Sequence, residues 1–153
     1  MSYATVSAAL RTRILTAVGI GTVYAYDPLT FDSPDSPEFA TNYVASSHVN
    51  TTWMKRTGVK TERAPDSDTS YWLFHSFRFS LQYGIKMTTS PAEFEAIVDS
   101  IIDKFNRSAA DTTLGGAALT YSLLQAPRMS DRLISGIACH VADFEIQIQE
   151  VLS

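Results

Sequence analysis

The run from Tyr71 to Tyr83 constrains the fold of this chain more than any other part of its sequence. Every second residue of this run is apolar except His75. These apolar residues are Tyr71, Leu73, Phe77, Phe79, Leu81 and Tyr83. The other parity carries polar side chains, among them Ser76, Arg78, Ser80 and Gln82. Successive side chains of a strand point to opposite faces of a sheet, so this run predicts a long strand with one buried face.

A partner for that strand is predicted at 53–63, because the five residues from Ala64 to Asp68 that separate the two segments are typical of a turn. The two strands are expected to form a long hairpin, 53–83. Toward the tip, polar side chains occupy both parities, so the tip lacks the apolar residues needed to bury it against its own domain.

The clearest helix signal begins at Ser90. Ser90, Pro91 and Glu93 match a capping box with proline at the first helical position, so the Ser90 hydroxyl is expected to accept a backbone N–H. Apolar residues then recur at helical spacing, namely Phe94, Ile97, Val98, Ile101, Ile102 and Phe105. The pattern predicts an amphipathic helix over 90–107 that packs on a sheet or on another helix.

The remaining elements are predicted from shorter patterns. Apolar spacing favours a helix over 3–18, ended by Gly19, and strands are expected at 22–26, 119–124 and 136–149. In the last strand the apolar parity changes between Val141 and Phe144. That change predicts either a bulge near Ala142 and Asp143 or a strand that crosses between two environments.

The order of these elements predicts an α+β fold, a two-layer sandwich. Its sheet is mostly antiparallel, its two main helices pack on one face, and a long hairpin protrudes. The chain 1–153 is expected to be a single domain. Residues 27–52 are predicted to be an extended excursion, because prolines and aspartates at its start prevent a regular element, while 39–49 fits a weak helix or an extended piece equally well.

Composition excludes several classes of function. The formal charge is −4 and the pI is near 5.2, so a groove that grips phosphates has no obvious source of cations. A single cysteine, Cys139, forms no internal disulfide, which argues against a disulfide-stapled secreted domain. No window approaches about 18 apolar residues, so the protein is expected to be soluble and intracellular, without a membrane partner.

No pattern in the sequence predicts a metal, a cofactor or a catalytic centre. Cys139 and His140 are adjacent strand residues that point to opposite faces, and His48 and His75 lack the spacing of zinc ligands. The glycines at 19 and 21 follow a helix and precede a strand, which reverses the order of a dinucleotide-binding motif. Asp66-Ser67-Asp68 fits a solvated turn better than a calcium loop.

Ser130, Asp131 and His140 could be imagined as a hydrolase set. No Gly-x-Ser-x-Gly elbow is present, however, so Ser130-Asp131 is predicted to cap a helix or a turn. The chain is therefore not expected to be an enzyme.

Surfaces rich in Ser and Thr and poor in charge suggest contact with other chains, since charged residues make up only 18% of the sequence. Trp53, Met54 and Trp72 lie in or beside a polar hairpin and fit either a core or a partner anchor. The candidate residues for a subunit or partner interface are Tyr26, Phe31, Phe39, Trp53, Met54, Arg56, Arg63 and Trp72.

The order of elements resembles the tail-terminator and neck proteins of long-tailed bacteriophages. The similarity rests on the first helix with its Gly19-Ile20-Gly21-Thr22 end, on the hairpin to Tyr83, on the helix 90–107, and on the closing run from Cys139 to Ile146. The resemblance implies a homo-oligomeric ring, usually a hexamer, that caps the tail tube protein and joins it to the head–tail connector protein. It also implies a virion location, with assembly in the host cytoplasm, no active site and no cofactor.

In such an assembly, DNA passes through the lumen without specific binding, and an acidic chain suits that passage because like charges repel. The excursion 27–52 is longer than the resemblance implies, which leaves open a tube-capping or a neighbouring neck position. Two other classes remain open. One is a small-ligand-binding or enzymatic domain on the same scaffold, and the other is a soluble adaptor or chaperone-like module.

Overall fold

The computed structural model describes residues 3–25, 49–65, 68–85, 88–105, 113–116, 118, 120–134 and 137–152. Its elements are α1 (Tyr3–Leu15), β1 (Thr22–Tyr24), β2 (Asn50–Arg63), β3 (Tyr71–Gly84), α4 (Ser90–Lys104), β4 (Thr120–Leu123), β5 (Arg128–Ile134) and β6 (Ile137–Leu152). The strands form a 6-stranded sheet in the order β1-β2-β3-β6-β4, with β5 also paired to β6. All pairs are antiparallel except β1 with β2.

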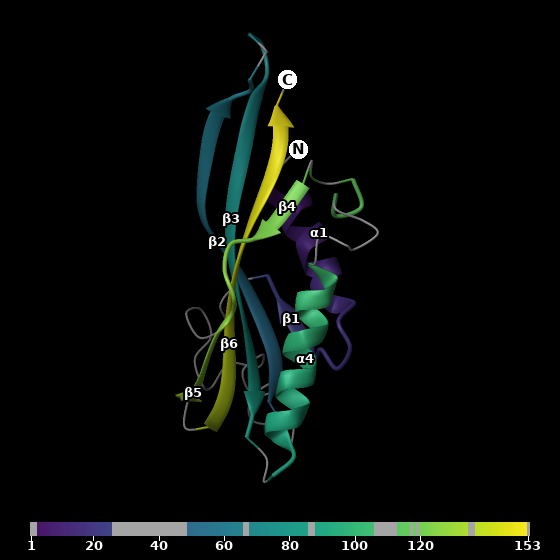
Figure 1. Ribbon diagram of the computed structural model, residues 1–153, viewed down its shortest axis with the longest axis vertical. Coiled ribbons are helices and arrows are strands. Elements are labelled where there is room, and N and C mark those ends of the chain that lie inside the picture. Colours follow the sequence, from purple (N-terminus) through teal and green to yellow (C-terminus); the bar gives the residue numbers. More distant parts are fainter. Residues whose placement is uncertain are drawn as a thin grey trace.

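Both helices lie on the same side of this sheet (Figure 1). The predicted α+β fold with a mostly antiparallel sheet is therefore confirmed. The predicted hairpin is confirmed as well, because β2 and β3 pair along their whole length. Residues 50–52, which were assigned to the excursion, instead begin β2, and residues 26–48 lie outside the described part of the chain.

The main core fills the space between the helices and the sheet. Met54, Phe79 and Phe144 are register partners across β2, β3 and β6, and the Phe79 and Phe144 rings stack with centroids 4.7 Å apart. The predicted apolar stripe of α4 is confirmed, since its members Phe94, Ile97, Val98, Ile101 and Phe105 are all buried in this core.

The first helix is shorter than predicted. It ends at Leu15, and Val18 is 76% exposed, so the apolar spacing does not extend the helix to residue 18. Gly19 does adopt the left-handed conformation predicted for the end of the helix, with φ 81°. Gly21 has a different reason to be glycine, because a Cβ there would overlap the carbonyl oxygen of Asn50.

The parity change in β6 reflects two environments. The register between β3 and β6 is continuous, and the register shift of the sheet lies in β2, between Arg56 and Gly58. Cys139 and Val141 pack with Val49 and Ile134 in a second apolar cluster, whereas the later apolar residues of β6 belong to the main core. The crossing between environments is confirmed, and the predicted bulge is wrong.

Strand β5 was not predicted. Its burial pattern is exposed at every position except Ile134, so it lacks the alternation that marks a strand. Ser130 and Asp131 were predicted to cap a helix or a turn, and that prediction is wrong because both lie inside β5. The strand is held by its pairing with the first half of β6.

The strands β2, β3 and β6 continue past the helices as a ribbon (Figure 1). β1 pairs with β2 only as far as Trp53, and residues 55–61 are all exposed. Within the described chain, the outer edge of β2 therefore has no neighbouring strand from Met54 to Arg63. We call this part of β2, residues 55–63, the ribbon edge.

Candidate functional site

The predicted interface residues do not form one site. Tyr26, Phe31 and Phe39 lie outside the described residues. Met54 is 0% exposed and belongs to the main core. Its assignment to an interface is corrected in favour of the core role, because a side chain enclosed by its own subunit cannot contact a partner.

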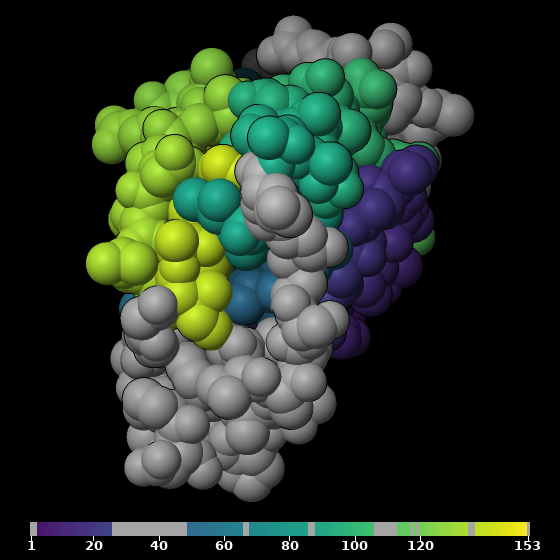
Figure 2. Space-filling model, turned by 90° about the horizontal axis from the view of Figure 1, so that it is seen from below, coloured from purple at the N-terminus to yellow at the C-terminus, as the bar shows by residue number. Residues whose placement is uncertain are grey.

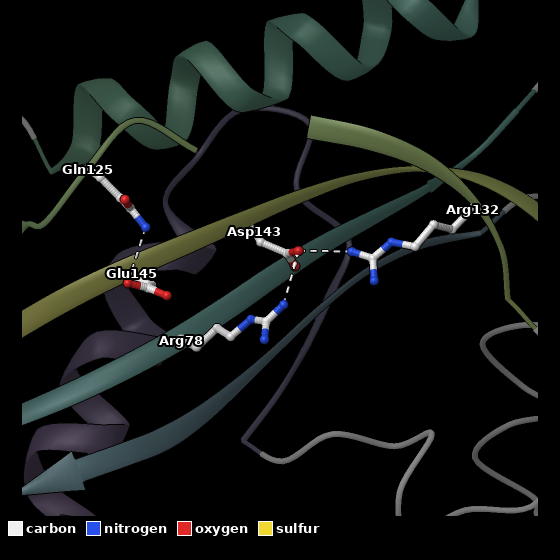
Figure 3. A network of polar contacts seen from close by, with 5 residues as sticks. All are labelled: Arg78, Gln125, Arg132, Asp143 and Glu145. Carbon is white, nitrogen blue, oxygen red and sulfur yellow. Dashed lines mark hydrogen bonds and ion pairs between the residues drawn. The ribbon is translucent and has the colours of Figure 1, made fainter. Parts of the chain in front are cut away.

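Trp53 lies on the sheet face that points away from the helices. Its neighbour Arg78 holds its guanidinium 5.9 Å from the indole centroid. Arg132 donates to Asp143 Oδ2 at 2.8 Å, and Arg78 forms an ion pair with the same oxygen at 3.1 Å. Gln125 donates to Glu145 beside them (Figure 3). This network joins β3, β5 and β6 across the outer face.

The three other predicted interface residues lie along the ribbon. Arg56 stacks over the Tyr3 ring at 4.5 Å, and Arg63 pairs with Asp68 at 2.8 Å. Trp72 on β3 makes an edge contact with Phe74, with centroids 6.2 Å apart. The Arg63 side chain is 60% exposed.

The ribbon edge is basic. It carries the cations Lys55, Arg56, Lys60 and Arg63 against the single carboxylate of Glu62, and all four cations are exposed. Val59, in the middle of the edge, is an apolar residue that is 52% exposed. An exposed strand edge that bears lysines resists pairing with another copy of itself, because like charges would face each other.

At the opposite end of the sheet, Asp131, His140 and Ser90 form a line of hydrogen bonds. The Asp131 carboxylate lies 2.6 Å from His140 Nδ1, and His140 Nε2 lies 3.1 Å from the Ser90 hydroxyl. A carboxylate only accepts, so Nδ1 donates to Asp131, and in the neutral imidazole Nε2 accepts from Ser90. β5, β6 and the first turn of α4 each supply one member.

This line corrects the prediction that Ser90 caps α4. The N-cap residue is Thr89, which has helical backbone angles and makes no side-chain cap bond. Ser90 is inside the helix and 0% exposed, with its hydroxyl directed to His140 instead. The sequence pattern located the start of the helix correctly but did not show that a sheet residue would compete for the hydroxyl.

A cavity of about 360 Å³ opens beside this line, between β5 and α4. Its lining combines apolar, acidic and neutral polar side chains: Pro91, Phe94, Glu95, Met129, Ser130, Asp131 and His140. In Figure 2, strand β6 (yellow) is visible at the floor between β5 (yellow-green) and α4 (teal). We call this the β5–α4 cavity.

Asp131, His140 and Ser90 are connected like the residues of a hydrolase triad, but their solvent exposure does not fit that function. A nucleophilic hydroxyl must reach substrate, yet Ser90 is 0% exposed and does not line the cavity. The Asp131 side chain, which would orient the base, is 68% exposed. The line therefore ties the start of α4 to the sheet.

A second buried pair holds the ribbon. His75 Nε2 and a Glu150 carboxylate oxygen lie 2.6 Å apart, with side chains 2% and 0% exposed. His75 was expected to be an interruption of its strand and the last strand was predicted to end at residue 149, so Glu150 was not predicted to be its partner. Extending the parity of Ile146 and Ile148 by one step would have placed Glu150 on the buried face beside His75.

Two buried groups titrate abnormally. Burial, together with the hydrogen bond and the negative charge of Glu93, raises the pKa of Tyr83 to about 12. Burial alone raises the pKa of the Cys139 thiol to about 11, and as predicted this thiol and His140 belong to opposite faces of the sheet. A thiol with so high a pKa is a weak nucleophile near neutral pH.

Comparison with known proteins places the chain in no group. No protein-family model matches it, and no curated protein matches it. Among the residues that the structure describes, no helix is long and apolar enough to cross a membrane, and no three His, Cys, Asp or Glu side chains cluster as a metal site.

Proposed function

We propose that this chain is the subunit of a ring at the head-proximal end of a bacteriophage tail tube, where it ends tube polymerisation and joins the tail to the head connector. The observation that carries the proposal is the ribbon of β2, β3 and β6, which extends beyond the helices with an open and exposed edge. The lysines oppose pairing of this edge with the same edge of another copy, so the edge favours covering by a different surface of another chain.

Two further observations support this function. The elements on which the resemblance rests, which are a first helix, a long hairpin, a second helix and a closing strand, occur in this order along the chain. The ribbon and the β5–α4 cavity are unlike surfaces at opposite ends of the sheet, and contacts between unlike surfaces generate a ring when the rotation closes. The subunit then acts through its geometry, covering the last tube subunit and presenting a different face to the connector.

The test is genetic and is made on assembled particles. In the phage that encodes the chain, an early stop codon should leave heads and tails unjoined, with overlong tails if the subunit caps the tube. Antibody labelling of complete particles should place the protein at the head–tail joint. Normal particles from the stop-codon phage would refute the proposal.

A second candidate function is a hydrolase, favoured by the Asp131–His140–Ser90 line beside a cavity. The burial of Ser90 argues against it. A fluorophosphonate probe, which labels activated serines, should leave the protein unmodified. Stoichiometric labelling that disappears in Ser90→Ala would instead favour the enzyme.

A further inference from the structure

We infer that the ribbon edge of one copy docks into the β5–α4 cavity of a second copy. The inference rests on the proposed ring function and identifies the two surfaces that meet between neighbouring subunits.

The charges of the two surfaces are complementary. The ribbon edge carries Lys55, Arg56, Lys60 and Arg63. Lys60 pairs with Glu62 and Arg63 with Asp68, so an excess of positive charge is left at Lys55 and Arg56. The cavity is lined by the carboxylates of Glu95 and Asp131, of which Asp131 is bonded to His140. Complementary charges steer association and fix the register of a contact more than they strengthen it. They also oppose the main competing contact, an antiparallel pairing of two ribbon edges, in which cations would face cations.

Each surface also exposes an apolar residue that its own subunit does not cover. Val59 on the ribbon edge is 52% exposed, and Met129 in the cavity wall is 50% exposed. Phe94 and Pro91 make the rest of the cavity partly apolar. In the proposed contact, Val59 packs beside Met129, and oppositely charged side chains surround the two. Specific interfaces commonly have such an apolar centre and a polar rim.

One copy cannot make this contact with itself. Val59 pairs with His75, and the cavity residue His140 pairs with Tyr83 on the same strand. At ~3.4 Å per residue, the path from His75 to Tyr83 is roughly 27 Å along β3. The contact is therefore between copies, and because its two surfaces differ, it repeats from subunit to subunit.

Disulfide trapping tests the inference on the full chain. A Val59→Cys variant, carrying an affinity tag, is mixed with an untagged Met129→Cys variant and oxidised with copper phenanthroline. We expect the mixed dimer to form at least about tenfold faster than in a mixture of Val59→Cys with Leu124→Cys. Leu124 is a matched control because it is also 50% exposed but does not line the cavity. Disulfide formation needs Cα atoms within about 7 Å, so the rate reports a defined contact.

Two further arms sharpen the result. A chain with both cysteines should give a ladder of linked oligomers. Val59 pairs with His75, and Met129 registers through Ala142 with Leu81, so roughly 20 Å along β3 separates the two positions and prevents an internal bond. Lys60→Glu and Glu95→Lys should each slow trapping several-fold, and combining the two changes across the two partners should restore it. The native Cys139 is buried with a pKa of about 11, so it does not compete.

Equal trapping rates for Met129→Cys and Leu124→Cys would overturn this inference, as would a predominance of Val59-to-Val59 dimers. Neither result would touch the proposed function if the stop-codon phage still fails to join heads and tails. Conversely, the proposed function fails if that phage assembles normally, even when the trapped dimer forms.

Discussion

Replacing Ser90 by Ala removes the hydroxyl that joins α4 to His140 Nε2 at 3.1 Å. Ser90 is 0% exposed and His140 is 9% exposed, so water has little access to the nitrogen that is left. Leaving a buried polar group without its partner costs about 1–3 kcal/mol. His140 keeps its bond to Asp131 through the other ring nitrogen, so we expect the free energy of unfolding to fall by about 1–2 kcal/mol.

For a chain of this size, 1 kcal/mol corresponds to roughly 2–4 °C in Tm, so the Ser90→Ala variant should melt roughly 2–8 °C lower. Thermal melting followed by circular dichroism at pH 7 measures the change. Thr89→Ala is the matched control, because the Thr89 side chain makes no cap bond and its loss should cost less than about 0.5 kcal/mol. An unchanged Tm for Ser90→Ala, together with a lowered Tm for Thr89→Ala, would refute the assignment and restore a side-chain cap.

Four further outcomes are expected. Cys139 should react with a thiol reagent at pH 8 about a hundredfold more slowly than an unburied cysteine, because its pKa is raised from 9.0 to about 11, and unfolding in urea should abolish this protection. Fast labelling of the folded protein would contradict the burial of Cys139. The pKa of Tyr83 is raised from 10.0 to about 12, so as the pH rises this phenol ionises in the unfolded chain before it ionises in the folded one. The stability that Tyr83 contributes should therefore be complete below pH 10.0 and fall up to about pH 12, and Tyr83→Phe should make that fall smaller in melting curves recorded at alkaline pH. Phe79→Ala should cost about 3–5 kcal/mol in urea unfolding, since the ring stacks at the centre of the core, and a loss below about 1 kcal/mol would contradict that position. Asp143→Ala should lower the free energy of unfolding by about 1–2 kcal/mol, because this carboxylate is 14% exposed and pairs with two arginines. Arg132→Ala should lower it by less than about 0.5 kcal/mol, because the Arg132 side chain is 49% exposed. Equal losses of stability in thermal melting would show that the shared carboxylate has no special role.

The elements that the sequence predicted well are those in which local pattern and tertiary burial agree. The stripe of α4 and the alternation of β3 both face one core, so periodicity alone was sufficient to find them. β5 was missed because it is an exposed edge strand held mainly by backbone bonds to β6, and such bonds leave no trace in side-chain polarity. The parity change of β6 fitted either a bulge or a change of environment, because both faces of this strand are buried near its start.

The candidate sites were less predictable than the fold, because they depend on residues that are distant in sequence. Ser90 and His140 are separated by 50 positions, and the packing of α4 on the sheet brings them together. His75 and Glu150 are separated by 75 positions, and the register of β3 with β6 brings them together. Capping chemistry offered a sufficient local role for Ser90, so nothing in the sequence indicated another. Met54 was misassigned because most residues of β2 are polar, although its cross-strand partner is Phe79.

The buried pair of His75 and Glu150 bears on what the ribbon can do. Burying such a pair is weak evidence of stability, because removing both groups from water costs about as much as their contact returns. Its effect here is to fix β6 against β3 beyond the helices, where the apolar core ends and register would otherwise be weakly specified. Arg56 adds to this anchoring, lying 3.5 Å from His75 and stacked over Tyr3 of α1. A ribbon whose register is fixed in this way needs less ordering on binding, which favours the specific contact between copies that we propose.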